Sequence, residues 1–88
     1  MAKFHFSLVA PERELYAGEV DQVDAPGTEG DFGVLAGHEP LMATLRPGVV
    51  TVYEGGARRL FEIRGGFADV TPVGFTLLAE HATEAAVQ

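Results

Sequence analysis

Glycine and proline divide this chain into short segments, and the apolar residues within those segments follow a period of two rather than a helical period. Phe4, Phe6 and Leu8, for example, alternate with His5 and Ser7. A period of two places one face of a strand in a core and the other in solvent. Turn residues recur about every 8–12 residues, which is typical of β-sandwiches and barrels. The sequence therefore predicts an all-β fold, a two-sheet antiparallel β-sandwich of about 8–10 short strands.

The strand pattern also predicts local features. The expected strands cover residues 4–8, 15–25, 31–35, 41–45, 49–53, 60–64, 67–71 and 75–79. The longest of these changes its apolar spacing from two to three part-way along, which predicts a bulge. Gly55 and Gly56 separate two strands and predict a hairpin, because glycine tolerates positive φ. Leu77 and Leu78 are adjacent apolar residues, so we expect the last strand to be covered on both faces.

The chain length sets the domain organisation. A chain of 88 residues is long enough for one small domain, since domains typically run to about 100–150 residues. We expect a β-sandwich over residues 1–82 and a short C-terminal tail over residues 83–88. The tail tolerates helix but is too short to form a stable helix alone.

Acidic residues dominate the charge of the chain. Thirteen Asp and Glu residues against six Lys and Arg residues give a formal net charge of −7. Nucleic-acid binders need a basic surface, so no nucleic-acid partner is expected. The chain has no cysteine, which excludes disulfides, thiolate zinc sites and cysteine nucleophiles. It shows neither an apolar run of membrane-spanning length nor a signal peptide, so we expect a cytoplasmic protein without direct membrane insertion.

The residues that could carry chemistry do not form a recognisable catalytic or metal site. His5, His38 and His81 lie in separate segments without the spacing of zinc ligands. Acidic pairs are explained more simply as solvated surface carboxylates than as general acids and bases. No catalytic residue, metal or cofactor is therefore expected.

The densest glycine stretch is Gly27–Gly33. A phosphate-binding loop is excluded there, because the stretch has no base and carries two acids that would repel phosphate. A tight exposed loop between strands is the better interpretation. Phe32, an aromatic residue inside this stretch, either plugs the open end of the sandwich or is presented to a partner.

Five blocks of residues, in this order and spacing, resemble the epsilon-subunit family of bacterial F-type ATP synthases, whose mitochondrial counterpart is called delta. The resemblance covers about Phe4 to Ala82. The blocks are Gly27-Thr28-Glu29-Gly30-Asp31-Phe32-Gly33-Val34-Leu35, Gly37-His38-Glu39-Pro40-Leu41, Arg46-Pro47-Gly48, Gly65-Gly66-Phe67-Ala68-Asp69-Val70 and Leu77-Leu78-Ala79-Glu80.

The resemblance implies a ten-stranded β-sandwich and a non-catalytic role in the central stalk. Family members attach to the gamma subunit and rest on the membrane rotor ring, so that ion (proton) translocation is coupled to ATP synthesis by rotation. The resemblance therefore implies gamma and the ring as partners. It also implies a peripheral position on the cytoplasmic side of the bacterial inner membrane.

The resemblance further implies two sets of binding residues. The ring-binding set is expected at one end of the sandwich, and an acidic, glycine-hinged loop there suits basic loops of a partner. The gamma-facing surface carries no short motif and is placed only loosely. The expected ring-binding residues are Glu29, Gly30, Asp31, Phe32, Gly33, Gly37 and His38, and the expected gamma-binding residues are Met42, Ala43, Arg64 and Gly65.

The sequence departs from the family at its C-terminus. Family members usually continue into a helical hairpin that carries inhibition and, in some members, nucleotide binding, and neither function is transferred to this chain. We therefore expect a short form that couples rotation without inhibitory helices. The alternatives are an all-β adaptor module and a lipoyl- or biotinyl-type carrier domain. The carrier chemistry needs a lysine at a hairpin tip, but the single lysine is Lys3, near the N-terminus.

Overall fold

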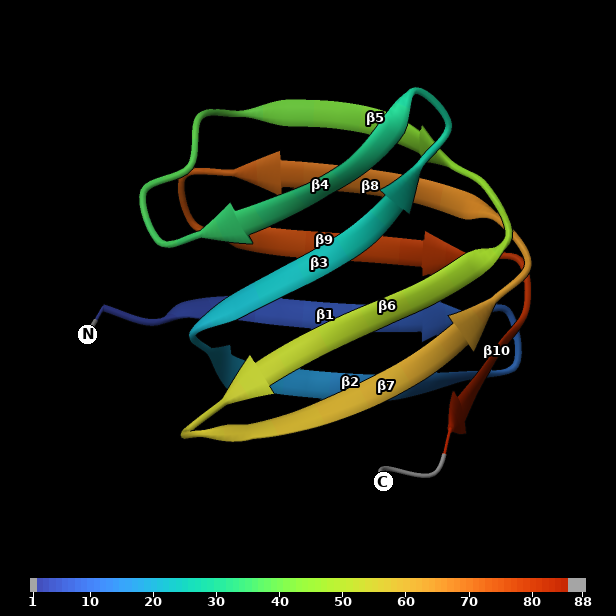
Figure 1. Ribbon diagram of the computed structural model, residues 1–88, viewed down its shortest axis with the longest axis horizontal. Coiled ribbons are helices and arrows are strands. Elements are labelled where there is room, and N and C mark those ends of the chain that lie inside the picture. The colour runs from blue at the N-terminus through green and yellow to red at the C-terminus, as the bar shows by residue number, and fades with distance from the viewer. Residues whose placement is uncertain (1, 86–88) are drawn as a thin grey trace.

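The computed structural model describes residues 2–85, which form ten β-strands and no helix (Figure 1). Alternating short apolar segments interrupted by glycine explain this, because no segment offers a helical face. The strands are β1 (Phe4–Ala10), β2 (Arg13–Val20), β3 (Gln22–Gly27), β4 (Gly30–Leu35), β5 (Leu41–Leu45), β6 (Gly48–Glu54), β7 (Ala57–Ile63), β8 (Gly66–Thr71), β9 (Gly74–Ala79) and β10 (Ala82–Ala85).

The strands form two packed layers that are joined through β3. The hydrogen-bonded order is β10-β7-β6-β3-β5-β8-β9-β1-β2, and β4 pairs with the other side of β3 along its whole length. Figure 1 shows β3, β6 and β7 lying across β8, β9, β1 and β2. The predicted all-β sandwich is therefore confirmed. The expectation of antiparallel pairing holds for every described pair except β1 and β9, which run parallel from His5 opposite Gly74 to Val9 opposite Leu78.

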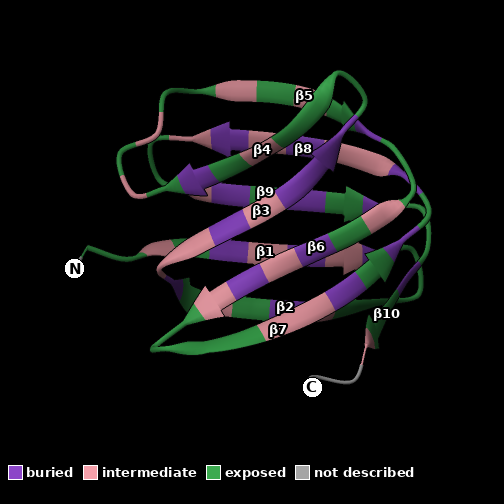
Figure 2. Cartoon of the chain, viewed as in Figure 1, coloured by how far each residue is buried: buried purple, intermediate pink, exposed green. Residues whose placement is uncertain are grey.

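The core lies between the two layers and is apolar throughout the described residues. Phe6, Leu8, Phe61 and Leu77 are each 0% exposed, and no polar or charged residue between positions 2 and 85 is buried. The ring of Phe75 meets that of Phe6 edge-on, with centroids 5.1 Å apart. Figure 2 shows the buried residues alternating with exposed ones along the strands, as the period of two predicts.

The predicted long strand 15–25 is wrong: the structure contains β2 and β3, separated at Asp21. The chain passes from one layer to the other at this residue, and its carboxylate accepts hydrogen bonds from the Gly55 amide (2.8 Å) and from the Lys3 ammonium (3.1 Å). Both contacts hold the pKa of Asp21 below its usual range. A change of layer shifts the apolar spacing just as a bulge does, which explains why the sequence predicted a bulge within residues 15–25. The register shift that the structure shows lies in a different strand, between Leu8 and Val9 of β1.

Two further local predictions have different outcomes. The hairpin at Gly55 and Gly56 is confirmed, with φ of 58° and 86°, the positive values that a two-residue turn between β6 and β7 requires. The prediction that β9 is covered on both faces is wrong within this chain. Leu77 is 0% exposed in the core, whereas Leu78 is 50% exposed on the outer side of the sheet.

The last described strand, β10, crosses the expected boundary between sandwich and tail. Residues 82–85 pair antiparallel with β7, from Ala82 opposite Ile63 to Ala85 opposite Leu60. A segment expected to tolerate helix is thus a strand, because β7 offers a free edge that satisfies its backbone groups. The rest of the expected tail, residues 86–88, lies outside the described residues.

Candidate functional site

The sandwich is open between β4 and β5. Strand β4 pairs with β3 along its whole length, and β5 pairs with β8 along its whole length. Within residues 2–85 these two strands meet only indirectly, through one pair between Gly27 of β3 and Leu45 of β5. A cavity of about 510 Å³ lies at this opening. We call it the β4–β5 groove; its lining residues are Gly27, Thr28, Glu29, Gly30, Phe32, Leu41, Met42, Ala43, Thr44 and Phe67.

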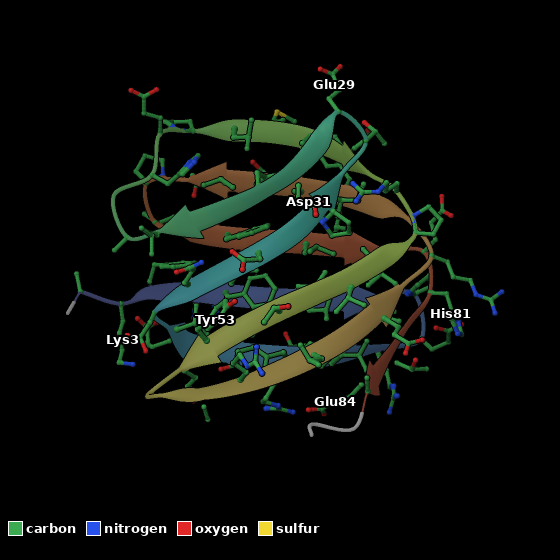
Figure 3. All side chains as sticks on the ribbon, in the orientation of Figure 1. Lys3, Glu29, Asp31, Tyr53, His81 and Glu84 are labelled. Atoms are coloured by element: carbon green, nitrogen blue, oxygen red, sulfur yellow. The ribbon has the colours of Figure 1, made fainter. Side chains whose placement is uncertain are left out.

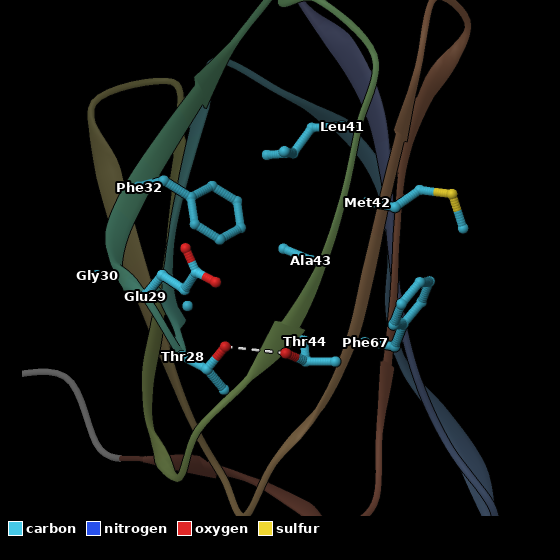
Figure 4. Close-up of a pocket in the computed structure, with 10 residues that line it drawn as sticks. Thr28, Glu29, Gly30, Phe32, Leu41, Met42, Ala43, Thr44 and Phe67 are labelled. Atoms are coloured by element: carbon cyan, nitrogen blue, oxygen red, sulfur yellow. Dashed lines mark hydrogen bonds between the residues drawn. The ribbon is translucent and has the colours of Figure 1, made fainter.

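The groove extends around the edge of β5. Figure 4 shows Phe32, Leu41 and Ala43 pointing into the space between β4 and β5, while Met42 and Phe67 lie on the other side of β5. Alternation along the strand explains this, because successive side chains point to opposite faces. Phe32 packs against the core as a partly buried residue. It therefore closes the mouth of the sandwich and remains accessible from the groove.

The outer side of the β5–β8–β9 sheet carries an apolar surface. Met42 is 67% exposed and Leu78 is 50% exposed. Phe67, which is half-buried, lies opposite Leu78 in the register and adjacent to β5 through Thr44. We call Met42, Phe67 and Leu78 the outer apolar face. Clustered exposed apolar side chains are typical of a protein-interaction surface.

The turn between β3 and β4 is tied to the neighbouring β5–β6 connection by Arg46. Its guanidinium donates hydrogen bonds to the Gly27 carbonyl (2.5 Å) and to Oδ1 of Asp31 (2.6 Å). The amide of Arg46 donates to the Pro26 carbonyl at 2.9 Å. Glu29 points away from the sheet at the tip of this turn (Figure 3). The two acids therefore differ, since Asp31 is engaged within the fold and Glu29 faces outward.

The expected ring-binding residues do not lie together at one end. Glu29, Gly30 and Asp31 are at the start of β4, whereas Gly37 and His38 follow its end. The reason is that β4 is fully paired from Gly30 to Leu35, and a strand of 6 residues separates its ends by about 17 Å. The expectation of a single end is therefore wrong for this set.

The expected gamma-binding residues are brought only partly together. Met42 and Ala43 are neighbours in β5 and point to opposite faces. Arg64 and Gly65 lie in the β7–β8 connection, where Gly65 reaches the end of β5 at Leu45 and accepts a hydrogen bond from the Glu80 amide at 3.0 Å. The first pair thus lies within β5, and the second lies beside the end of β5.

The opposite side of the sandwich is closed by polar contacts around Arg59. Its guanidinium pairs with both carboxylate oxygens of Glu84 at 2.8 Å and lies 5.0 Å from the centre of the Tyr16 ring. Tyr16 donates a hydrogen bond to Glu54 at 2.7 Å. Burial and this hydrogen bond raise the pKa of Tyr16 to about 12, while Arg59 holds the pKa of Glu84 below its usual range. These contacts join β2, β6, β7 and β10, so within residues 2–85 the β4–β5 side is the open one.

Sequence reasoning missed three residues of this region: Arg46, Phe67 and Leu78. Arg46 stands in the Arg-Pro-Gly block, but its partners come from a distant segment. The adjacent pair Leu77 and Leu78 was the available signal for an apolar residue on the outer face. Phe67 followed two glycines and gave no signal beyond its place in a strand.

The described histidines and acids do not assemble into a metal centre. Between residues 2 and 85, no cluster of three or more His, Asp or Glu side chains could hold a metal ion. His5 contacts Glu19 on neighbouring strands, and His38 contacts the backbone carbonyl of Glu39. Over the same residues, no helix is long and apolar enough to cross a membrane.

Comparisons with known proteins identify the family of this sandwich. A family model described as the β-sandwich domain of the ATP synthase delta/epsilon chain matches residues 3–85. The chain belongs to this family. Its members include the ATP synthase epsilon chain of Caulobacter vibrioides, which is 70% identical over 98% of this chain and 100% of its own length. The epsilon chain of Hyphomonas neptunium is 64% identical over 91% of this chain and 60% of its own length.

Solved structures agree with the family assignment. A chain in the structure of the Euglena gracilis mitochondrial ATP synthase, OSCP/F1/c-ring in rotational state 1, has a TM-score of 0.88 at 31% identity, over 96% of this chain and 54% of that chain. A chain of the Tetrahymena thermophila enzyme, at 16% identity and a TM-score of 0.79, shows the same fold. Epsilon-family membership makes this chain a non-catalytic central-stalk subunit of an F-type ATP synthase. The family assignment replaces the two alternatives, an all-β adaptor module and a lipoyl- or biotinyl-type carrier domain.

Proposed function

We propose that this chain links the gamma subunit to the membrane rotor ring, so that ion translocation and ATP synthesis are coupled through one rotating unit. The observation that carries the proposal is the 70% identity to the Caulobacter epsilon chain over that relative's whole length. The proposed position is peripheral, on the cytoplasmic side of the bacterial inner membrane.

The two partners are assigned to different parts of the surface. The β5 region, with Met42, Ala43, Gly65 and the adjoining Arg64, is proposed to face gamma. Its exposed apolar side chains suit a permanent protein contact. The β3–β4 turn is proposed to face the ring through the outward carboxylate of Glu29. Gly30, Phe32 and Gly33 shape this turn and the following strand.

The remaining expected ring residues receive modified roles. Asp31 is proposed to act indirectly, because its carboxylate is held by Arg46 at 2.6 Å. Gly37 and His38 lie beyond the far end of β4, so a flat partner that meets the turn end-on does not reach them. We assign them no part in the ring contact. The β3–β4 turn alone then carries that contact.

Mechanical coupling demands stiffness rather than chemistry. Each strand between β1 and β10 is hydrogen-bonded to at least one neighbour, and the side opposite the groove is closed by the contacts of Arg59. Arg46 fixes the turn that carries Glu29 to the β5–β6 connection. Torque applied to the outer apolar face is therefore transmitted to the turn through paired strands instead of through a flexible loop.

The test is affinity purification of the tagged chain from solubilised membranes of its own cells. We expect gamma and the ring subunit to copurify with the chain. Membranes that lack the chain should show ATP hydrolysis poorly coupled to proton pumping, and the added chain should restore that coupling. Copurification of neither gamma nor the ring would contradict the proposed function.

A further inference from the structure

Strand β5 is an unprotected sheet edge. Within residues 2–85, β2, β10 and β4 lie at edges of the sheet. Strand β5 follows β3 in the sheet but shares only the pair Gly27–Leu45 with it, so the rest of its side away from β8 is an edge as well. Edge strands usually carry charges that discourage pairing with another chain. β2, β10 and β4 each contain at least one acid, whereas β5, with the sequence Leu-Met-Ala-Thr-Leu, contains no charged residue. Its edge therefore lacks the usual protection.

The backbone of β5 presents free hydrogen-bonding groups at this edge. The carbonyl of Thr44 accepts a hydrogen bond from the Thr28 amide at 3.0 Å, so it points away from β8. Residues two apart along a strand point their backbone groups to the same side. The N–H and C=O of Met42 therefore also point away from β8, into the open side between β5 and β4. An unpaired backbone edge of this kind is a template for an added strand.

We propose that an extended segment of the gamma subunit adds to the edge of β5 as a further strand. This inference rests on the proposed function and specifies how the gamma contact is made. Alternate side chains of the added strand would enter the β4–β5 groove beside Phe32 and Leu41, a cavity of about 510 Å³. The side chains between them would cover the outer apolar face at Met42 and Phe67.

The lining of the groove defines the chemistry of this segment. Most of its side chains are apolar or small, so the segment is uncharged and apolar over most of its length. Glu29, whose carboxylate is assigned to the ring, is the charged residue among those that line the cavity, so the segment needs no charged side chain of its own. A second copy of this chain is a poor occupant, because each copy carries a net charge of −7 and like charges repel.

The discriminating experiment compares Met42→Pro with Met42→Val in capture of purified gamma. Proline removes the outward N–H, and sheet edges tolerate proline where the N–H faces outward. Valine keeps the N–H and an apolar side chain. We expect capture by Met42→Pro to weaken at least tenfold and capture by Met42→Val to stay within twofold of the parent chain. Circular dichroism and thermal melting establish that both variants are folded.

Hydrogen exchange on the unaltered chain provides a test that does not depend on a folded proline variant. On gamma binding, the amide of Met42 should become strongly protected, while the amide of Gly56, in the turn between β6 and β7, should not. A folded Met42→Pro variant that binds gamma normally, or an unprotected Met42 amide in the complex, would overturn strand addition. Self-association through β5 in place of gamma binding, measured by sedimentation, would also overturn it. Failure of the unaltered chain to bind gamma at all would instead defeat the proposed function.

Discussion

At the scale of single residues, the two acids of the β3–β4 turn have different environments although they are close in sequence. Asp31 is held by Arg46, and Glu29 points into solvent. Sequence reasoning treated both as ring contacts, because acids in a glycine-rich stretch look alike without their partners. The distinguishing contact comes from Arg46, in a separate turn. The predicted loop over Gly27–Gly33 is confirmed only as a turn at Thr28 and Glu29, because the other residues belong to β3 and β4. The individual roles required the fold.

The first prediction concerns these two acids. Glu29→Gln should weaken capture of the rotor ring several-fold and make capture less sensitive to salt, without changing the free energy of unfolding. Asp31→Asn should cost about 0.5 kcal/mol of stability, a modest amount because exposed ion pairs contribute about 0.2–1 kcal/mol. Arg46→Gln is the matched variant, and the double variant with Asp31→Asn should be less destabilised than the sum. Equal loss of ring capture in Glu29→Gln and Asp31→Asn, with stability unchanged in both, would refute this division.

The second prediction concerns Tyr16. The fold favours its neutral phenol and raises its pKa to about 12, whereas an unfolded tyrosine has a pKa of about 10. The contribution of Tyr16 to stability is therefore complete below about pH 10 and is lost as pH rises toward 12. Tyr16→Phe removes the hydrogen bond to Glu54 and should therefore lower the free energy of unfolding by about 1 kcal/mol at neutral pH. As pH rises above about 10, the stability of this variant should also fall less steeply than that of the parent chain.

Urea unfolding at neutral pH and near pH 11 measures both effects of Tyr16→Phe. Tyr53→Phe is the comparison, since the hydrogen bond of Tyr53 to Asp24 also raises its pKa but at a more accessible position. A Tyr16→Phe variant whose stability falls with alkaline pH as steeply as that of the parent chain would show that Tyr16 does not titrate as described.

At the scale of elements, alternation predicted strands wherever an apolar face met the core. The expected strands from β4 to β9 agree with the structure within a few residues. The corner at Asp21 was missed because a change of layer and a bulge shift the apolar spacing in the same way. Strand β10 was missed because Ala-Thr-Glu-Ala has little intrinsic strand preference. Its conformation depends on pairing with β7 and on the contact of Glu84 with Arg59.

The third prediction concerns the start of β8. Gly66 has φ of 154°, and a Cβ there would lie 2.2 Å from the carbonyl oxygen of Leu78 and 2.9 Å from Cα of Ala79. Both are backbone atoms of the adjacent strand, so neither can move aside without breaking the pairing of β8 and β9. Gly66→Ala should therefore cost about 2–4 kcal/mol. Chemical denaturation provides the measurement.

The matched control for Gly66→Ala is Gly56→Ala in the β6–β7 hairpin. Gly56 also has positive φ, at 86°, but no atom lies within 4 Å of a Cβ built there. Its substitution should cost only about 1–2 kcal/mol, from backbone conformation alone. Equal losses in the two variants would mean that the close approach of β8 and β9 has no energetic consequence.

At the scale of the whole molecule, the candidate surface results from strands that are distant in sequence. Sequence reasoning selected Phe32, Met42 and Ala43, and the structure brings all three to the β4–β5 groove. The expectation that Gly37 and His38 share an end with Glu29 was wrong although a strand over residues 31–35 was predicted. The ends of a fully paired strand lie far apart, and Gly37 and His38 follow the far end of β4. The outer apolar face needs three strands in register, which no local pattern reveals.

The fourth prediction concerns folding. Non-local strand pairing dominates the fold, including the parallel pairing of β1 with β9, and such topologies fold slowly, in about milliseconds to seconds. We expect a single cooperative transition, since residues 2–85 share one core. Stopped-flow tyrosine fluorescence measures the rate, and coincidence with far-ultraviolet circular dichroism checks cooperativity. Separate transitions for the two layers would contradict this expectation.

The parallel pairing of β1 with β9 also affects how the chain is made. On the ribosome, residues appear in order, and Gly74 is synthesised about 70 residues after His5, its partner in the sheet. At about 5–20 residues per second, β1 and β2 wait about 3–14 seconds for the strand that completes their layer. Throughout that interval the apolar side chains of β1 and one free strand edge face the cytosol. The newborn chain is thus most vulnerable to aggregation at its beginning, and we expect its dependence on chaperones to end only when synthesis has passed β9.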